Sequence, residues 1–414
     1  MTLPRKLPDS AVPWLRGAAI QRVFDALQKD GDEVRAVGGA VRNALLGEPI
    51  RDVDMCTTAL PQQVIERAEA AGLKAVPTGI DHGTVTVISS GGPFEVTTLR
   101  EDVETFGRHA VVRFGRDWAH DAARRDFTMN ALYCGADGTI HDPLGGGLED
   151  CLARRVRFIG RAEDRIREDY LRILRFFRFH ATYGAGPTDD EGLSASVRLR
   201  DGLTQLSAER IGAEMKKILA VGACPPVIAV MEGTGILPLL TGGVARLASL
   251  AALKSLSDEL PEAGSPILAL ACLTGFVGED AGRIARRWRL SNQERSVMFR
   301  AIEGSASLLQ ASDPAAVLKA QMLAWGREAA QDALILAQAR TRSAARDEGG
   351  VVGLHELARS WDIPVFPVTG HDLITAGVPK GPALGSAMEH LRRLWAASDY
   401  RAARDELLAA VAAK

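Results

Sequence analysis

The sequence predicts an α+β chain in which a small N-terminal domain with a mixed sheet precedes a longer all-helical part. Runs rich in β-branched residues, which favour strands, are confined to the first 140 residues. Beyond about residue 150 the chain is rich in Ala, Leu and Arg and shows helical periodicity. Its length of 414 residues exceeds that of one ordinary domain, so we expect two to four domains.

Elements of both kinds can be placed in the N-terminal part. Proline and glycine mark the ends of one expected helix, because Pro61 suits a first helical turn and Gly72 follows the last one. The expected elements are strands at 34–37, 84–88 and 94–99 and helices at 40–46 and 62–71.

Composition narrows the class of protein. With 46% hydrophobic and 25% charged residues, the chain is globular rather than disordered or repetitive. The net charge of -2 offers no global argument for nucleic acid, and the excess of Arg (41) over Lys (9) is best explained by codon usage. Five scattered cysteines predict a reducing compartment rather than a disulfide framework. Because neither a signal-peptide core nor a spanning apolar stretch is present, we expect a cytoplasmic protein that does not bind membranes.

Two aspartates form the first chemical signal, in RDVDMC at 51–56. Residues two apart in a strand point to one face, so Asp52 and Asp54 would project side by side, with Val53 and Met55 facing a core. Paired hard oxygen ligands suit Mg²⁺. Taken alone, such a pair is more often a solvated strand edge.

A glycine turn lies upstream of this pair, in VGGAVRN at 37–43. The succession of a strand, two glycines and a helix exposes backbone N–H groups that can bind a phosphate. Arg42 in the first turn adds a charged donor. The turn is neither a Walker loop nor a GxGxxG fingerprint. Gly38 and Gly39 by themselves would also fit an ordinary strand-to-helix turn.

A third acid, Glu95, falls in the expected strand FEVTTL. Such an acid is usually paired or at a sheet edge. The alternative is that it joins Asp52 and Asp54 around two metal ions, one activating a hydroxyl and the other steadying a leaving phosphate oxygen.

These blocks resemble the family of tRNA nucleotidyltransferases and bacterial poly(A) polymerases. The similarity covers roughly residues 30–185 in the family's order, and a later stretch at 370–385 resembles its C-terminal region. The blocks that carry it are VGGAVRNALLG, RDVDMCTTALP, FEVTTLRED, GRHAVVRFG, HDAARRDFTMNALY, HDPLGGGLEDCLARRVRFIG, RIREDYLRILRFFRFH and GHDLITAGVPKGPALG.

The resemblance implies a fold and a division into domains. It implies a nucleotidyltransferase head of the DNA polymerase beta type with a mixed sheet at 1–150. A helical neck with the nucleotide-selecting motif would follow at 151–220, a helical body at 221–340 and a helical, tRNA-binding tail at 341–414. Residues 100–116 resemble the family's flexible loop beside the nucleotide.

The resemblance also assigns roles to the residues of the head. Gly38, Gly39 and Arg42 correspond to the triphosphate-binding turn, Asp52 and Asp54 to the metal-binding pair, and Glu95 to the third acid. One departure concerns Asn43, where the family commonly has Asp. This departure puts in question what holds the Arg42 side chain in place, but it does not affect the metal-binding residues.

Base selection is implied by REDYLR at 167–172, which we expect within one helix. Spacings of three and four residues bring Glu168, Asp169 and Arg172 onto a common surface, which would ordinarily mean a surface ion pair. In this family the pattern resembles the nucleotide-selecting motif. An Asp can accept from the exocyclic amine of cytosine or adenine, whereas uracil and guanine would leave it unpaired, at a cost of about 1–3 kcal/mol. Glu168 would orient Arg172.

The block RRDFTMNAL adds two nucleotide-binding candidates. Arg125 could meet the triphosphate and Asp126 a ribose hydroxyl, although a charged helix start is the plainer alternative.

Together these features imply template-independent addition of CCA to the 3′ end of tRNA from CTP and ATP. Pyrophosphate would be released by two-metal, in-line transfer with Mg²⁺, and the protein would be a monomer or weak dimer. Basic segments at 154–178 and 283–289 are candidates for tRNA phosphate contact, or else solvated helix faces. The alternatives are a poly(A) polymerase, a partial CC- or A-adding enzyme, and a catalytically dead RNA-binding module.

Overall fold

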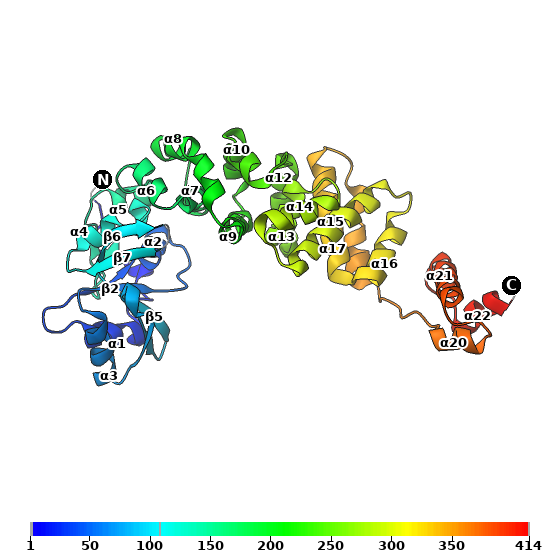
Figure 1. The fold of residues 1–414 in the computed structure, drawn as a ribbon, viewed down its shortest axis with the longest axis horizontal. Coiled ribbons are helices and arrows are strands. Elements are labelled where there is room, and N and C mark those ends of the chain that lie inside the picture. Colours follow the sequence, from blue (N-terminus) through cyan, green and yellow to red (C-terminus); the bar gives the residue numbers. More distant parts are fainter. Residues whose placement is uncertain (1–2, 107–108, 413–414) are drawn as a thin grey trace. The chain divides into compact units, whose positions relative to one another are not determined.

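The computed structural model describes residues 3–106 and 109–412, which divide into two compact units, Met1–Ile236 (unit 1) and Leu237–Lys414 (unit 2). Unit 1 contains the strands and unit 2 is helical (Figure 1). A mixed sheet followed by a helical remainder was the predicted order, and it is confirmed. The finer division into head, neck, body and tail stays a prediction.

The sheet of unit 1 has seven strands in the order β3-β4-β5-β2-β1-β8-β9. It is mixed because β2 and β5 run parallel while the other neighbours run antiparallel. The three strands expected from the sequence are present as β1, β4 and β5. The seven strands are β1 (Val34–Val37), β2 (Asp54–Thr57), β3 (Lys74–Gly79), β4 (Thr84–Ser89), β5 (Gly92–Thr98), β8 (Tyr133–Cys134) and β9 (Ile140–His141).

A separate two-stranded antiparallel sheet is formed by β6 (Arg100–Phe106) and β7 (His109–Phe114). The sequence predicted a loop over 100–116. Outside residues 107–108, which the structure does not describe, most of this stretch is paired strand. The two segments form strands through backbone hydrogen bonds with each other, and the residue pattern did not predict this pairing.

Helices α1 and α3 pack on strands β3 and β4 of the sheet, α2, α4 and α5 also belong to the head, and α6 to α10 follow it. Val23, Phe24 and Leu27 of α1 and Val64 of α3 are buried, as expected for amphipathic helices lying on a sheet. The helices are α1 (Ala18–Leu27), α2 (Gly39–Leu46), α3 (Pro61–Ala70), α4 (Trp118–Ala123), α5 (Gly147–Leu152), α6 (Ala162–Glu168), α7 (Leu171–Tyr183), α8 (Asp190–Arg198), α9 (Ala208–Ala220) and α10 (Pro225–Gly233).

An aromatic cluster attaches α7 to the head. The Phe127 ring lies 4.9 Å from that of Phe158 and 5.0 Å from that of Phe179, between ring centroids, and Phe158 stacks on Phe176 at 5.5 Å. Burying each such ring contributes about 1.5–3 kcal/mol. α7 is therefore held firmly where its N-terminal turn can meet the head.

Unit 2 is built from helix pairs around apolar cores. One core joins α15, α16, α17 and α19, and a second holds α20 to α22 with Leu323 of α16 packed against it. No helix among the described residues is long and apolar enough to cross a membrane. The helices are α11 (Ile236–Thr241), α12 (Leu247–Leu256), α13 (Pro266–Thr274), α14 (Glu279–Trp288), α15 (Asn292–Gln310), α16 (Pro314–Trp325), α17 (Arg327–Ser343), α18 (Gly349–Val352), α19 (Leu354–Ser360), α20 (Gly370–Thr375), α21 (Pro382–Ala397) and α22 (Arg404–Ala412).

Candidate active site

A glycine turn joins the first strand of the sheet to helix α2. β1 ends at Val37 and α2 begins at Gly39, so Gly38 makes the turn, with φ 65° and ψ -111°. A side chain would be strained there, and its Cβ would lie 3.4 Å from the carbonyl oxygen of Asn130. Gly38 and Gly39 line a cavity at the start of α2, and the first amide groups of a helix favour anions.

Two carboxylates lie beside this turn on adjacent strands. Asp54 is the first residue of β2, opposite Val37 of β1 and next to Glu95 of β5. Asp54 is exposed, but partial desolvation by the surrounding protein raises its pKa above its ordinary value, and the charges of Glu95 and Asp52 raise it further. Arg125 opposes this rise. Asp54 is therefore close enough to each of the other two acids to be repelled by it.

The prediction that Asp52 and Asp54 share the face of one strand is wrong for Asp52. β2 begins at Asp54, and Asp52 lies in the irregular segment before it. The reason is that Asp54 pairs with Val37, after which the partner chain turns away at Gly38. A residue before Asp54 has no strand to pair with on that side.

The acids do not form a closed set of metal ligands. Among the side chains that the structure describes, those of residues 3–100 and 113–410, no group of three or more His, Cys, Asp and Glu lies close enough to hold a metal ion. The donors nevertheless suit a hard divalent cation, because Asp52 and Asp54 supply carboxylate oxygens whose mutual repulsion a cation would relieve.

A cavity of about 570 Å³ opens beside the turn, within the size range of small-molecule sites. Five arginines and three aspartates line it, so it suits a large polar anion. Eight of the predicted site residues line this cavity, whereas Asp52, Glu95 and Glu168 do not. The lining residues are Gly38, Gly39, Arg42, Asp54, Arg125, Asp126, Asn130, Asp169, Leu171, Arg172, Arg175, Phe179 and Arg210.

Arg42 is held by neutral partners. Its guanidinium donates to Asn43 Oδ1 at 2.8 and 3.1 Å, to Asn130 Oδ1 at 2.5 Å and to the Tyr183 hydroxyl at 2.7 Å. Burial lowers the pKa of Arg42. The concern raised by Asn43 is thereby resolved, because its amide oxygen supports Arg42 and leaves the positive charge unneutralised.

Arg125 is held in place by an ion pair with Asp121 of α4. Asp121 Oδ2 accepts from Arg125 Nη2 at 3.0 Å and from the Tyr133 hydroxyl at 2.8 Å, and Oδ1 accepts from Arg124. Burial would raise the pKa of Asp121, but Arg125 and Arg124 outweigh it and hold the pKa below its ordinary value. This anchor leaves Nη1 of Arg125 on the side of Gly38, 3.7 Å from where a Cβ would stand.

Replacing Asp121 with Asn is expected to destabilise the protein by about 3 kcal/mol or more at pH 7, because buried arginines lose their counterion. Since the folded-state pKa lies below 3.8, this stabilisation is fully present above that value and is lost as the pH falls further. Urea unfolding should therefore show a constant wild-type-to-variant difference from pH 7 to about pH 5 and a smaller one below pH 3.8. Asp9→Asn, on an exposed ion pair, is the control. An equal difference at all pH values would contradict the assignment.

Asp126 is buried and accepts several hydrogen bonds from the protein. It accepts from Arg175 Nε at 2.8 Å, from Asn130 Nδ2 at 3.0 Å and from its neighbour Phe127 N at 2.9 Å. It lines the cavity as predicted, but most of its accepting capacity is used within the protein.

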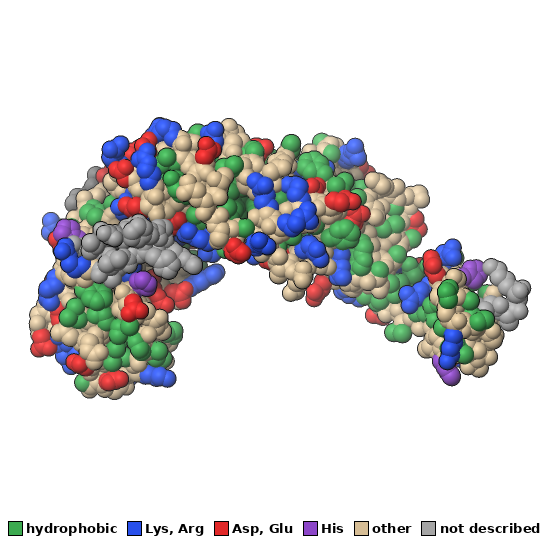
Figure 2. Space-filling view, viewed as in Figure 1, with side chains coloured by type: hydrophobic (Ala, Val, Ile, Leu, Met, Phe, Trp, Pro, Cys, Tyr) green, Lys and Arg blue, Asp and Glu red, His purple; other side chains and the backbone are tan. Residues whose placement is uncertain are grey.

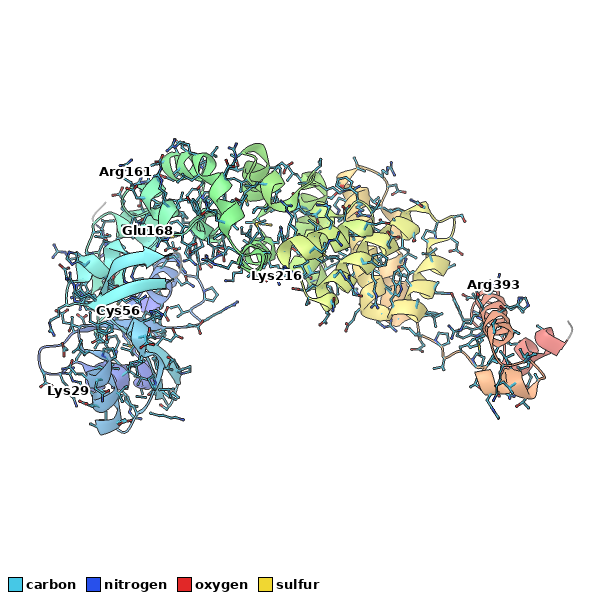
Figure 3. The ribbon with its side chains drawn as sticks, viewed as in Figure 1. Lys29, Cys56, Arg161, Glu168, Lys216 and Arg393 are labelled. Atoms are coloured by element: carbon cyan, nitrogen blue, oxygen red, sulfur yellow. The ribbon has the colours of Figure 1, made fainter. Side chains whose placement is uncertain are left out.

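The segment predicted to select the nucleotide is not one continuous helix. α6 ends at Glu168 (labelled in Figure 3), Asp169 is extended with φ -157°, and α7 begins at Leu171. The prediction of a single helix over 167–172 is therefore wrong. Tyr170 lies tightly against Gly202, where an added Cβ would lie 2.1 Å from its ring, and this packing accompanies the break.

The two residues expected to contact the base have separate counterions. Arg172 donates to Glu168 Oε2 at 2.5 Å, which confirms the predicted pair. Asp169 Oδ2 instead accepts from Arg210 Nη2 of α9 at 2.6 Å. Both groups line the cavity with Arg210.

Sequence reasoning missed four polar or aromatic lining residues. Arg175 and Phe179 follow Arg172 at helical spacing, so a helical projection could have found them. Asn130 lies four residues after Asp126. Arg210 has no such signal, because α9 approaches Asp169 only through tertiary packing.

The basic segment 154–178 is not a bare cationic surface. Each of its nine arginines has a carboxylate within 4 Å, several from elements outside the segment. In unit 2, Lys and Arg side chains gather near α14 (Figure 2). There Arg283 and Arg287 donate to backbone carbonyls at the end of α11, and Arg286 is exposed, as is Arg287.

Known proteins resemble the chain over nearly its whole length. A family model described as the Poly A polymerase head domain matches residues 34–157. Human CCA tRNA nucleotidyltransferase 1, mitochondrial, is 36% identical over 412 residues, which cover 97% of this chain and 92% of the relative. The CCA-adding enzyme of Levilactobacillus brevis is 32% identical over 387 residues, covering 89% of this chain and 91% of the relative.

A solved structure agrees with these relatives. The crystal structure of the Bacillus stearothermophilus CCA-adding enzyme in complex with CTP is 28% identical, with a TM-score of 0.70, and the match covers 91% of this chain and 92% of that one. The family model falls on the sheet domain, which confirms the predicted nucleotidyltransferase head followed by a helical remainder. The chain is therefore a nucleotidyltransferase and belongs to the family of CCA-adding tRNA nucleotidyltransferases.

Proposed function

We propose that this enzyme adds CCA to the 3′ end of tRNA from CTP and ATP without a template, releasing pyrophosphate. The observation that carries the proposal is a single cavity that unites the glycine turn, Asp54 and the pair Asp169 and Arg172. The relatives named for CCA addition support the choice of reaction.

Each wall of the cavity has a role in this proposal. The amides after Gly38 and the charge of Arg42 bind the triphosphate, and Arg125 extends this cationic wall. Asp169 accepts from the exocyclic amine of the base and Arg172 donates to a ring acceptor. Asp126, which is paired with Arg175, meets a ribose hydroxyl of the nucleotide, between the triphosphate and the base.

The acids beside the turn suit Mg²⁺. We propose that Asp52 and Asp54 bind it, with Glu95 as the third acid on the neighbouring strand. When bound, the metal would activate the attacking hydroxyl and stabilise the leaving oxygen of an in-line displacement. The protein's own contribution is to hold carboxylates together against their repulsion.

One assay tests the function. The purified protein is given tRNA lacking its last three nucleotides, together with each labelled triphosphate singly and with CTP and ATP combined. Addition of three nucleotides supports the proposal. A product that stops after CC or gains only A indicates a partial enzyme, and a long A tail indicates a poly(A) polymerase. No product at all would identify an RNA-binding module without activity. Size-exclusion chromatography tests the expected monomer or weak dimer.

Binding of tRNA is expected to weaken with salt. Each phosphate contact releases counterions, so affinity should fall about tenfold between roughly 50 and 200 mM salt for every two phosphates contacted. Arg286→Ala should lower the salt slope by about 1 if this exposed side chain meets a phosphate. Filter binding measures both quantities. Affinity that does not change with salt would show that phosphate contacts do not hold the tRNA.

A further inference from the structure

A chain of charged side chains adjoins Arg172 outside the cavity beside the glycine turn. Glu168, the last residue of α6, holds Arg172 through Oε2, which accepts from Nη1 at 2.5 Å. Its other oxygen, Oε1, accepts from Nη2 of Arg165, which lies three residues earlier on the same helix. Neither Arg165 nor Glu168 lines the cavity. Any influence of these two residues on a bound base therefore passes through Arg172.

Arg165 is itself fixed between three helices. Only 19% of its side chain is exposed, and its Nη1 donates to the carbonyl oxygen of Ala123, the last residue of α4, at 2.9 Å. Its backbone carbonyl accepts from Nη1 of Arg172 on α7 at 3.0 Å. Arg125 of the cavity wall follows the end of α4 by two residues. Arg165 thus joins the helix end that precedes Arg125 to the residues that hold Arg172.

The donors that Arg172 has left depend on this arrangement. Both of its bonds within the protein use Nη1, and among the described residues its Nε and Nη2 have no partner. A guanidinium and a carboxylate bond most strongly when two nitrogens meet both oxygens of the acid. Arg165 opposes such a pair, because it occupies Oε1 of Glu168. Two nitrogens of Arg172 therefore stay available to a ligand in the cavity that Arg172 lines.

The charges of the cluster favour the same arrangement. Arg165 and Arg172 share the single carboxylate of Glu168, so Glu168 neutralises only part of the charge of Arg172. Asp169, the next acid along the chain, pairs with Arg210 instead, at 2.6 Å. Arg172 thus keeps positive charge for an acceptor on the nucleotide.

We propose that Arg165 is a positioning residue for base selection. By occupying Oε1 of Glu168, it limits Glu168 to one oxygen on Arg172 and keeps the other donors of Arg172 for the base. The inference rests on the proposed function, in which Arg172 donates to a ring acceptor of cytosine or adenine. Without Arg165, both oxygens of Glu168 are free to bond Arg172, and the base loses its donor.

The test removes Arg165 and then removes the grip that its loss permits. Arg165→Ala is compared with the same variant carrying Glu168→Gln, because an amide has one acceptor oxygen and cannot bond a guanidinium through two. Arg167→Ala is the matched control. It also removes an arginine from α6, but Arg167 pairs with Glu163 and Asp164 and does not line the cavity.

Two quantities are measured on each purified full-length variant. The first is the CTP-to-UTP ratio, which is kcat/KM for CTP divided by kcat/KM for UTP, with tRNA lacking its last three nucleotides. The second is the Ki of inorganic tripolyphosphate as a competitor of CTP. Tripolyphosphate has no base, so its Ki reports the triphosphate-binding wall separately from base selection.

Arg165→Ala is expected to lower the CTP-to-UTP ratio at least about fivefold, as coupling within one polar network allows, and to leave the Ki of tripolyphosphate unchanged. Adding Glu168→Gln should restore most of the ratio. Arg165→Lys, which keeps a donor for Oε1 but lacks the forked guanidinium, should lie between the wild type and Arg165→Ala. Arg167→Ala should equal the wild type in both quantities.

Two results would overturn the inference. One is a CTP-to-UTP ratio that stays at the wild-type value in both Arg165 variants. The other is a lowered ratio that Glu168→Gln does not restore and that accompanies weaker binding of tripolyphosphate, because Arg165 would then only support the end of α4. Urea unfolding shows whether Arg165→Ala folds, and Arg165→Lys carries the test if it does not. Failure of the proposed function is distinct, since the wild type itself would then add no nucleotide or show no preference for CTP over UTP.

Discussion

Replacing Asp54 or Asp52 with alanine is expected to slow nucleotide addition by about a thousandfold or more, with little change in tRNA affinity. Each substitution removes one carboxylate of the proposed Mg²⁺ pair, and loss of about 4 kcal/mol of transition-state stabilisation corresponds to that factor. Single-turnover rates with tRNA lacking its last three nucleotides measure the effect, and filter binding measures the affinity.

Glu69→Ala is the matched control for these two variants, because Glu69 is an exposed acid on α3 that lines neither the cavity beside the glycine turn nor a second, adjoining cavity of about 560 Å³. Its rate should equal that of the wild type. The two aspartates differ in one respect, since Asp54 lines both cavities and Asp52 only the second. A near-normal rate in either alanine variant would exclude that residue from the metal-binding pair.

Substituting Asp169 or Arg172 with alanine is expected to reduce discrimination between correct and incorrect bases about five- to 150-fold. This corresponds to the roughly 1–3 kcal/mol that an unpaired buried polar group costs when uracil or guanine replaces cytosine or adenine. The measurement is kcat/KM for each of the four triphosphates with a fixed tRNA acceptor. Discrimination, rather than overall rate, is the informative quantity.

Arg210→Ala should shift discrimination in the same direction, because Arg210 holds the carboxylate of Asp169 at 2.6 Å. Arg198→Ala supplies the matched control, since Arg198 pairs with Glu163 at 2.7 Å and lines neither cavity. If the ratios of kcat/KM among the four triphosphates stay unchanged in the Asp169 and Arg172 variants, base selection lies elsewhere in the protein.

The local parts of the site could be predicted from the sequence because they depend on near neighbours. Two glycines between a strand and a helix led directly to the turn at Gly38, whose positive φ only glycine adopts without strain. Asp54 follows closely in sequence, and the antiparallel pairing of β1 with β2 brings it opposite Val37. The Glu168–Arg172 pair likewise spans one helical turn of sequence.

The sequence-based predictions were wrong or incomplete where tertiary packing overrides the local sequence pattern. The helix predicted through Asp169 is interrupted, and Asp169 is held in an extended conformation while it pairs with Arg210. The positive surplus of segment 154–178 made it a candidate for phosphate contact or else a solvated helix face, and neither alternative included the acids from other elements that its arginines meet, such as Glu48, Asp126 and Glu214. Charge counted along a segment does not include these long-range partners.

The sequence alone determined the class of fold, the place of the glycine turn and the acids beside it, because strand propensity, glycine conformation and close spacing act over a few residues. Only the tertiary structure decided which side chains complete the site. Arg210 reaches Asp169 across 41 positions and Tyr183 reaches Arg42 across 141, so these contacts depend on how α7 packs against the head and α9 against α7. The same packing divides the space around Asp54 into two cavities, since a wall made of residues distant in sequence exists only once the helices have docked.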